Sequence, residues 1–326
     1  MLLAEIKGTG VGLPEKIATN NDLAEFLDTS DEWIAERTGI RERRIAAKET
    51  LTELCEKAAL QAMERAGVTA KELDTIIVAT LTADNPLPNA SSCLQKALGA
   101  DNAVCYDISA ACSGFIFALN IARLHIQCGD EKNILVVGGE ILSKIMDWTD
   151  RSTCILFGDG VGAAVVGPAE EGRGILAVDL GSNGAKGHVL RMEGRPIVNP
   201  FRETTEDLTK KRYVQMEGQE VFKFAVSQVP ISIRKILDKT GKRVDDVDWF
   251  VLHQANMRII KSAAKRLKAP DEKFVLNMQR YGNTSAASVP IVLDEAIQNG
   301  MIKKGDLVVL SGFGGGLTWG SMLIQM

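Results

Sequence analysis

The chain has 326 residues, of which 45% are hydrophobic and 25% charged, as expected for a folded enzyme of two domains or one duplicated domain. Its net charge of −4 argues against general nucleic-acid binding but is compatible with a local basic patch. No apolar run reaches the roughly 20 residues that span a bilayer, and residues 1–7 alternate like a strand rather than a signal peptide, so we expect no membrane association and a cytoplasmic location.

Short runs rich in Val, Ile and Leu predict buried strands. They lie at residues 75–80, 133–137, 154–157, 249–253 and 307–310. Helical patterns alternate with these runs, at residues 51–66, 114–127, 218–239 and 257–267. Such alternation is typical of α/β layers built around largely parallel strands.

The six cysteines include no CxxC pair and do not cluster with the three histidines. This pattern argues against a zinc site and against a disulfide framework. It indicates reduced thiols in the cytoplasm, and we expect no bound metal.

The chain repeats weakly at an offset of 174 residues. Two separated segments keep this register, in that Gly67 and Asp74 correspond to Gly241 and Asp248, and residues 133–138 correspond to 307–312. We interpret this as a duplicated α/β unit with halves at residues 1–171 and 172–326, although chance agreement is the alternative. Two similar halves packed about a pseudo-twofold axis would bring corresponding loops together at the centre.

Cys112 is the first candidate for chemistry. It lies among small residues in the segment DISAACSG (107–114), directly before an apolar helical pattern. A tight turn would let a substrate approach the sulfur, and the helix N-terminus would favour the thiolate and lower its pKa. The alternative is a buried structural cysteine, which suits Cys105 and Cys128 well.

His253 and Asn283 are the other two candidates. His253 ends a predicted strand and precedes a polar turn, while Asn283 lies in a turn before a helix that Ser288 is expected to cap. Either residue alone fits a structural role, as a satisfied histidine or a turn-forming asparagine. The predicted duplication nevertheless places both at one cleft with Cys112, outside the strand ends where α/β sheets bind ligands.

Two surface features are also visible in the sequence. Thr29 and Glu32 have capping-box spacing at the start of a short helix, on which Trp33 and Arg37 share a face. Further on, basic residues spaced by three or four positions line one helical face, without any acid from residue 257 to 270. They are Arg258, Lys261, Lys265 and Lys268, with Arg266 nearby. An ordinary packing residue and a solvated helix face are the simpler interpretations.

Six segments together resemble the β-ketoacyl-acyl carrier protein synthase III family, the condensing enzymes that start type II fatty-acid synthesis. They are TSDEWIAERTGIRERR (29–44), DISAACSGF (107–115), ILFGDGVGA (155–163), VLHQANMRII (251–260), RYGNTSAASVP (280–290) and FGGGLTWGS (313–321). The resemblance covers essentially the whole chain. It implies the thiolase-like fold, with two duplicated α/β halves in a layered αβαβα arrangement.

The resemblance also implies a reaction. Cys112 would take the acyl group from a short acyl-CoA, and His253 with Asn283 would stabilise the enolate formed when malonyl-acyl carrier protein loses carbon dioxide. Backbone amides at Cys112 and near Gly315 would bind the tetrahedral oxyanion, and Phe313 would help to expel the carboxylate. The products would be β-ketoacyl-acyl carrier protein, CoA and CO2, with no cofactor.

Binding roles follow from the same resemblance. It assigns coenzyme A to Trp33, Arg37, Arg151 and Asn256, and the acidic carrier protein to Gln254, Arg258, Lys261, Lys265 and Arg266. It assigns the acyl pocket to Leu142 and, across a homodimer interface, to Leu87 of the loop 82–88.

Two other functions stay open on the sequence alone. The first is an acyltransferase of the same fold that passes the acyl group from Cys112 to an oxygen or nitrogen acceptor in secondary metabolism. Intact His253 and Asn283 argue against it, because simple acyl transfer forms no enolate. The second is a non-catalytic subunit that binds acyl carrier protein, and the presence of Cys112 argues against that.

Overall fold

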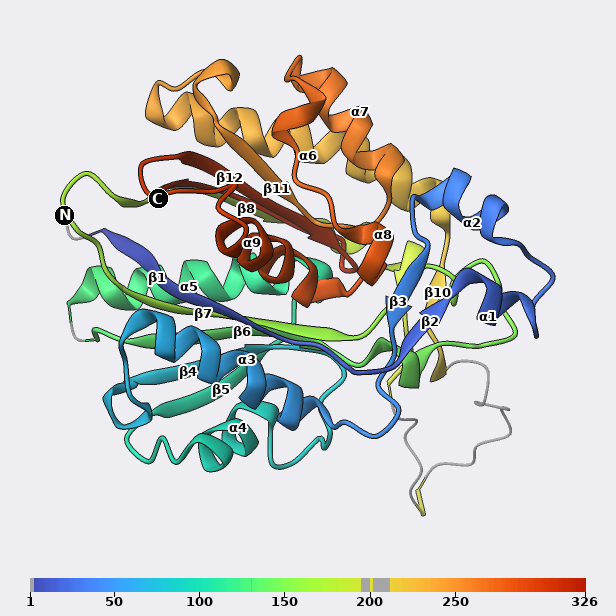
Figure 1. Cartoon of the computed structure of the whole chain (residues 1–326), viewed down its shortest axis with the longest axis horizontal. Coiled ribbons are helices and arrows are strands. Elements are labelled where there is room, and N and C mark those ends of the chain that lie inside the picture. The colour runs from blue at the N-terminus through green and yellow to red at the C-terminus, as the bar shows by residue number, and fades with distance from the viewer. Residues whose placement is uncertain (1–2, 130, 195–199, 202–211) are drawn as a thin grey trace.

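Two β-sheets lie one above the other, with helices between them and on both outer faces (Figure 1). The computed structural model describes residues 3–129, 131–194, 200–201 and 212–326. Reading across Figure 1, the layers alternate helix, sheet, helix, sheet, helix. The expected αβαβα arrangement is confirmed.

The first sheet has the order β1-β7-β6-β4-β5, and the second has the order β11-β12-β13-β8. The strands of the first are β1 (Ala4–Gly12), β4 (Thr75–Ala79), β5 (Val104–Ile108), β6 (Ile134–Glu140) and β7 (Gly160–Pro168). Those of the second are β8 (Gly174–Ser182), β11 (Trp249–Leu252), β12 (Leu307–Gly314) and β13 (Thr318–Gln325). The central strands are buried along their length, which explains their unbroken apolar runs.

The duplication extends to the pairing register. Thr75 pairs with Ile134 in the parallel ladder of β4 and β6. The positions 174 residues later, Trp249 and Val308, pair in the parallel ladder of β11 and β12. In the first sheet β7 pairs antiparallel with β6, and β1 pairs antiparallel with β7. In the second sheet β13 and β8 follow β12 in the same way. Both halves therefore share one plan.

Two helices fill the space between the sheets. They are α5 (Gly114–Cys128) and α9 (Ser288–Gln298), and each contacts strands of both sheets. Both are apolar around most of their circumference because they are covered on two sides. Outside the first sheet lie α3 (Leu51–Ala66) and α4 (Ala90–Leu98), and outside the second lie α6 (Gly218–Thr240) and α7 (Met257–Leu267).

Smaller elements gather at one end of the stack (Figure 1). They include β2 (Ile17–Thr19), α1 (Asn20–Ala24), α2 (Asp31–Thr38), β3 (Glu42–Arg44), β9 (Leu190–Arg191), β10 (Gln215–Met216) and α8 (Met278–Tyr281). Short 3-10 helices connect the larger elements, among them η1 (Ala70–Glu72), η2 (Ala111–Ser113), η3 (Leu142–Ile145), η4 (Gly184–Val189), η6 (Val244–Asp246), η7 (Asp271–Lys273) and η8 (Ser285–Ala287).

The structure corrects four local predictions. Ser288 is the first residue of α9 rather than its cap, and Cys128 is exposed rather than buried. Residues 154–157 are not a strand, because the backbone turns there and only Phe157 makes an isolated bridge, to Asn283. The cap of α2 is Ser30 rather than Thr29, since the Ser30 side chain accepts from the Trp33 N–H at 3.2 Å. The first strand begins at Ala4, and the predicted Met1 and Leu2 lie outside the described residues.

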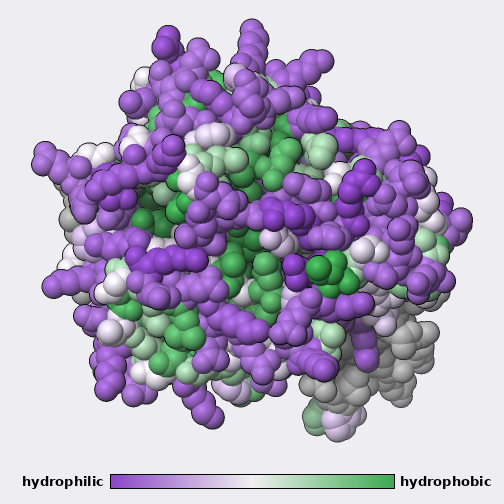
Figure 2. Space-filling model, viewed as in Figure 1, coloured by the Kyte–Doolittle hydropathy of each residue, from purple (hydrophilic) through white to green (hydrophobic). Residues whose placement is uncertain are grey.

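Hydrophilic side chains cover most of the face shown in Figure 2, and hydrophobic ones appear in smaller areas between them. Within the described residues, none of the helices has the length and apolar character needed to cross a bilayer.

Candidate active site

Cys112 and Ser285 belong to equivalent turns that meet at the centre of the molecule. Cys112 lies in η2 and Ser285 begins η8, and these two turns are in contact. Ala111 and Ser285, 174 positions apart, have φ values of +46° and +51°, in the left-handed region that non-glycine residues seldom adopt. Such strain often marks functional sites, and here it occurs at the same point of both halves.

His253 and Asn283 reach this centre from the second half. The His253 N–H donates to the Ser311 carbonyl at 2.8 Å, which continues the ladder beyond β11. Asn283 donates its N–H to the Leu156 carbonyl at 2.9 Å and accepts from the Gly158 N–H at 3.0 Å. Cys112, His253 and Asn283 line one cavity of about 580 Å³. The expectation that they face one cleft is confirmed.

Burial opposes ionisation of the Cys112 thiol. The residue is 7% exposed, and loss of solvent raises the pKa of the thiol to about 12. A hydrogen bond with the Ser285 side chain acts in the opposite direction, with a smaller effect. The predicted lowering of the Cys112 pKa is therefore wrong, because desolvation outweighs the hydrogen bonds that favour the thiolate. Thiol attack needs a proton acceptor.

His253 is held as a neutral hydrogen-bond donor. Complete burial lowers the pKa of its imidazole to about 3. Its Nδ1 lies 2.5 Å from the Ser288 hydroxyl, which also accepts from the Gln254 N–H at 3.3 Å. That hydroxyl makes no further hydrogen bond within the described part of the chain, so Nδ1 is the acceptor for its proton. The imidazole proton then resides on Nε2.

Asn283 is fixed as a donor in a comparable way. Its Oδ1 accepts from the Ser285 N–H at 2.9 Å. With its acceptor occupied, the side chain offers the Nδ2 hydrogens to a ligand in the cavity. Two neutral donors, His253 Nε2 and Asn283 Nδ2, thus serve the same cavity as Cys112.

The glycine run after Phe313 packs against the nucleophile. A Cβ on Gly314 would lie 2.7 Å from the Cys112 nitrogen, so only glycine permits this close approach. Gly315 lies beside Ala111 and lines a pocket with Cys112. The Phe313 ring meets the His253 ring edge-on, with 5.0 Å between centroids and 71° between planes.

The outer part of the cavity is lined by Trp33, Arg37 and Asn256. The guanidinium carbons of Arg37 and Arg151 lie 4.4 and 5.2 Å from the centroid of the Trp33 ring. Asn256 caps α7, accepting from the Arg258 N–H at 2.8 Å, and its Nδ2 donates to the Arg37 carbonyl at 3.1 Å. The structure brings together all four residues expected to bind coenzyme A.

A smaller pocket of about 100 Å³ opens on Cys112, with mostly apolar walls. Leu142 lines it as expected, and so do Leu81, Phe157 and Ser285, which no motif in the sequence singles out. Leu87 is 87% exposed and lines neither this pocket nor the larger cavity.

The basic stripe of α7 is exposed, but one residue assigned to carrier-protein binding is not. Arg258, Lys261, Lys265 and Arg266 are all exposed. Gln254 is 1% exposed, and its side chain donates to the Leu252 and Val275 carbonyls while accepting from the Asn277 N–H. The assignment of Gln254 to the docking surface is therefore wrong, because all its polar groups are used inside the protein.

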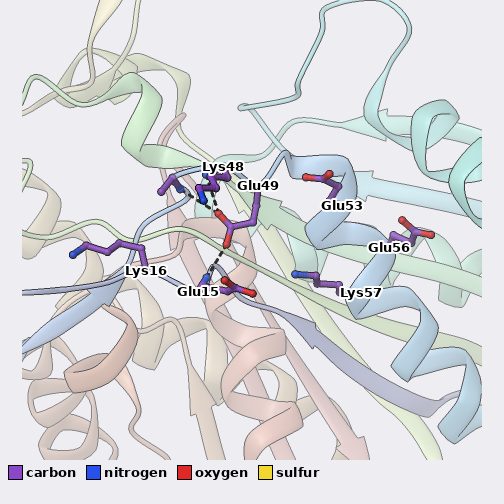
Figure 3. Close-up of a pocket in the computed structure, with 8 residues that line it drawn as sticks. Glu15, Lys16, Lys48, Glu49, Glu53, Glu56 and Lys57 are labelled. Atoms are coloured by element: carbon purple, nitrogen blue, oxygen red, sulfur yellow. Dashed lines mark hydrogen bonds between the residues drawn. The ribbon is translucent and has the colours of Figure 1, made fainter.

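A separate hollow of about 640 Å³ lies between the β1–β2 connection and the start of α3 (Figure 3). Charged side chains line most of it, and Glu49 at its centre accepts from the backbone N–H groups of Glu15, Ala47 and Lys48. These bonds lower the pKa of Glu49 to about 2. Although its volume is larger than that of the central cavity, its central acid serves to tie loops together, so we assign it no chemistry.

The fold, the cysteine in a strained turn and the two neutral donors define a condensing enzyme of the thiolase-like class. Profiles of 3-oxoacyl-[acyl-carrier-protein] synthase III match residues 106–184, and those of its C-terminal part match residues 237–326. A β-ketoacyl-[acyl-carrier-protein] synthase III from Clostridium acetobutylicum is 48% identical over 321 residues, 98% of each chain. One from Desulfitobacterium hafniense is 49% identical over 327 residues, covering 100% of this chain and 98% of the relative.

A crystal structure of 3-oxoacyl-[acyl-carrier-protein] synthase III from Aquifex aeolicus superposes with a TM-score of 0.93 at 46% identity, covering 99% of this chain and 100% of the other. The protein belongs to the β-ketoacyl-acyl carrier protein synthase III family. It is an acyltransferase of the condensing type.

Proposed function

We propose that the protein condenses a short acyl-CoA with malonyl-acyl carrier protein through an acyl-cysteine, and so starts fatty-acid synthesis. The observation that carries this proposal is one cavity lined by Cys112 together with two neutral donors, His253 and Asn283. Residues 1–171 would form the half that supplies the nucleophile, and residues 172–326 the half that supplies both donors.

In the first stage, the Cys112 sulfur attacks the acyl-CoA carbonyl and CoA leaves as the thiolate. The tetrahedral oxyanion is stabilised by backbone N–H groups at Cys112 and in the Gly314–Gly315 run, which packs directly on Cys112. The acyl chain enters the apolar pocket at Leu142. Its volume of about 100 Å³ favours short primers.

In the second stage, malonyl thioester loses carbon dioxide and its thioester oxygen becomes an enolate oxygen. His253 Nε2–H and Asn283 Nδ2–H donate to that oxygen, and Phe313 keeps the carboxylate in an apolar setting. The enolate carbon then attacks the acyl-cysteine and frees the Cys112 sulfur. Side chains and substrates supply every group in this sequence, so no cofactor is needed.

The outer cavity suits coenzyme A. The indole of Trp33 offers a stacking face for adenine, and Arg37 and Arg151 offer positive charge for phosphates. Asn256 holds the α2 and α7 sides of the opening together through its bond to the Arg37 carbonyl.

We propose a homodimer formed through the edge of the first sheet. The edge strand β5 has unpaired backbone groups on its outer side, and Val104 on it is 62% exposed. Leu124 of α5 and Leu87 are 45% and 87% exposed, so apolar surface accompanies the open edge. A partner docked there would cover Leu87, which would then approach the partner's acyl pocket. We place the protein in the cytoplasm, where its free thiols stay reduced.

The exposed basic stripe is the proposed docking surface for the acidic carrier protein. Arg258 also lines the central cavity and donates to the Glu36 carbonyl, so the test uses the two lysines that do not line it. We expect Lys261→Glu with Lys265→Glu to raise the Michaelis constant for malonyl-acyl carrier protein, because the reversed charges repel an acidic partner. Such charges act mainly on association and are screened over about 8 Å at physiological ionic strength. The wild-type constant should therefore rise with salt, whereas that of the variant should be high and nearly independent of salt.

Self-acylation from acetyl-CoA is the internal control for this pair of substitutions, and Lys242→Glu with Arg243→Glu, exposed charges outside α7, is the matched surface control. Carrier-protein kinetics that survive the double reversal would show that the stripe is only a solvated helix face.

The function itself is tested with purified protein, malonyl-acyl carrier protein and a panel of acyl-CoA primers. We expect β-ketoacyl-acyl carrier protein by mass, with release of one CO2 per product. Acyl transfer to another acceptor without CO2 release would favour the alternative acyltransferase function and contradict the proposal.

A further inference from the structure

A buried carboxylate lies next to the nucleophile. Glu140 ends β6 and is 0% exposed. Its carboxylate accepts from the hydroxyls of Thr82 at 2.5 Å and Thr80 at 3.2 Å, and from the Leu81 N–H at 3.2 Å. Within the described residues no ion pair neutralises it. A buried acid without a paired base is costly, and such groups often serve chemistry.

Ser285 connects this carboxylate to Cys112. Its hydroxyl donates to Glu140 Oε1 at 3.5 Å, its side chain lines the same pocket as Cys112, and its interaction with the sulfur lowers the pKa of the Cys112 thiol. The hydroxyl has one proton for these two neighbours: turned to the sulfur it stabilises the thiolate, and turned to the carboxylate it leaves the serine oxygen free to accept the thiol proton. Ser285 holds this position through the strained φ of +51°, and its side chain lines the acyl pocket.

The other candidate base is unsuitable. His253 has its Nδ1 occupied by the Ser288 hydroxyl and presents Nε2–H to the cavity, so it has no free lone pair for the thiol proton. The raised pKa of Cys112 means that the thiol does not ionise by itself near neutral pH.

Resting on the proposed function, we propose that Glu140 accepts the Cys112 thiol proton through the Ser285 hydroxyl during self-acylation, and returns it when condensation frees the sulfur. As the sulfur–carbon bond forms, the thiol proton passes to the Ser285 oxygen and the serine proton passes to Glu140. CoA departs as a thiolate and is protonated by solvent. When the enolate displaces Cys112, Glu140 sends its proton back along the same path, so the relay ends as it began.

The electrostatic setting of Glu140 suits this exchange. Burial raises the pKa of its carboxyl to about 7. A general base works best when its pKa lies near the pH at which the enzyme operates. The titratable groups that interact with it are Lys144 of η3, Cys55 of α3 and Cys112 of η2. Lys144 donates to the Thr82 and Ala83 carbonyls and favours the carboxylate without contacting it.

The test measures single-turnover acetylation from acetyl-CoA between pH 5 and 9, by intact mass. The wild-type rate should fall below about pH 7, because protonated Glu140 cannot accept. We expect Glu140→Gln and Ser285→Ala to acetylate about 10²–10⁴-fold more slowly near neutral pH and to lose this inflection. Glu140→Asp should keep the inflection at a reduced rate.

Asp159→Asn is the matched control for neutralising a buried acid. Asp159 is also 0% exposed, and it accepts from the Ala46 and Ser143 N–H groups and the Ser143 hydroxyl. This variant should keep the wild-type pH profile.

A purely structural Glu140 makes the opposite prediction, because its negative charge raises the Cys112 pKa and its removal would assist ionisation. Acetylation by Glu140→Gln that is as fast as wild type, or that keeps the wild-type pH profile, would overturn the proposal. If Glu140→Gln does not fold, the other two variants decide. A Ser285→Ala variant that keeps the inflection, or a Glu140→Asp variant that acetylates at the wild-type rate, would then overturn the proposal. Failure of the wild type to acetylate at Cys112 would be distinguishable, since it contradicts the proposed function itself.

Discussion

Replacing Cys112 with alanine should abolish condensation. The sulfur is the only nucleophile toward acyl-CoA in the proposed reaction, so the variant has no route to the acyl-enzyme. By analogy with the removal of other covalent nucleophiles, the rate should fall by on the order of 10⁴–10⁶-fold. Product formation from acetyl-CoA and malonyl-acyl carrier protein, followed by mass, measures this loss.

Cys55→Ala provides the matched control, because Cys55 is another buried free cysteine, on α3. It should keep its activity apart from a cost in stability. Condensation by Cys112→Ala at a rate within tenfold of wild type would mean that acyl transfer is direct and needs no cysteine.

His253→Ala and Asn283→Ala should separate the two stages of the reaction. Each removes one donor to the enolate oxygen, which forms only after the acyl group is on Cys112. Each lost donor should raise the free-energy barrier to decarboxylation by roughly 3–4 kcal/mol, as the loss of one oxyanion-hole donor does in other enzymes. Self-acylation from acetyl-CoA should change much less. Release of CO2 from labelled malonyl-acyl carrier protein and acetylation by mass measure the two stages separately.

The pH dependence of decarboxylation follows from the same assignment. The pKa of His253 is lowered to about 3, so the imidazole is neutral, with Nε2–H available, across the range from pH 5 to 9. The decarboxylation stage should therefore show no inflection near pH 6.5.

His125→Ala and Asn277→Ala are the matched controls for the His253→Ala and Asn283→Ala variants, because both residues lie outside the cavity. Equal losses in both stages for His253→Ala would show that this residue activates the thiol instead.

Much of the fold could be predicted from the sequence because local and global signals agree. The helix at 51–66 has the predicted bounds, and the 174-residue offset reappears as an identical register of β4 with β6 and of β11 with β12. The strand predicted at residues 154–157 is wrong because an apolar run is expected wherever the backbone is buried, in a sheet or outside one. Here burial comes from packing beside Asn283, not from a sheet.

The site residues could be found, but their electrostatics could not. The position of Cys112 before a helix predicts a lowered pKa, yet the actual direction depends on how completely the surrounding halves exclude water. Gln254 was misplaced because the helical spacing of α7 does not reveal that the preceding turn is buried. Glu140 gave no sequence signal, and Ser288 gave only that of a helix cap, since both act through contacts with residues more than 30 positions away in the chain.

The most direct test of Cys112 as the nucleophile is incubation of the protein with acetyl-CoA alone, followed by digestion and peptide mass analysis. We expect one acetyl group per chain, on the peptide that contains Cys112, because that thiol lines both the coenzyme A cavity and the acyl pocket. Acetyl on the peptide of Cys105 or Cys154 instead, or no covalent adduct at all, would contradict this assignment.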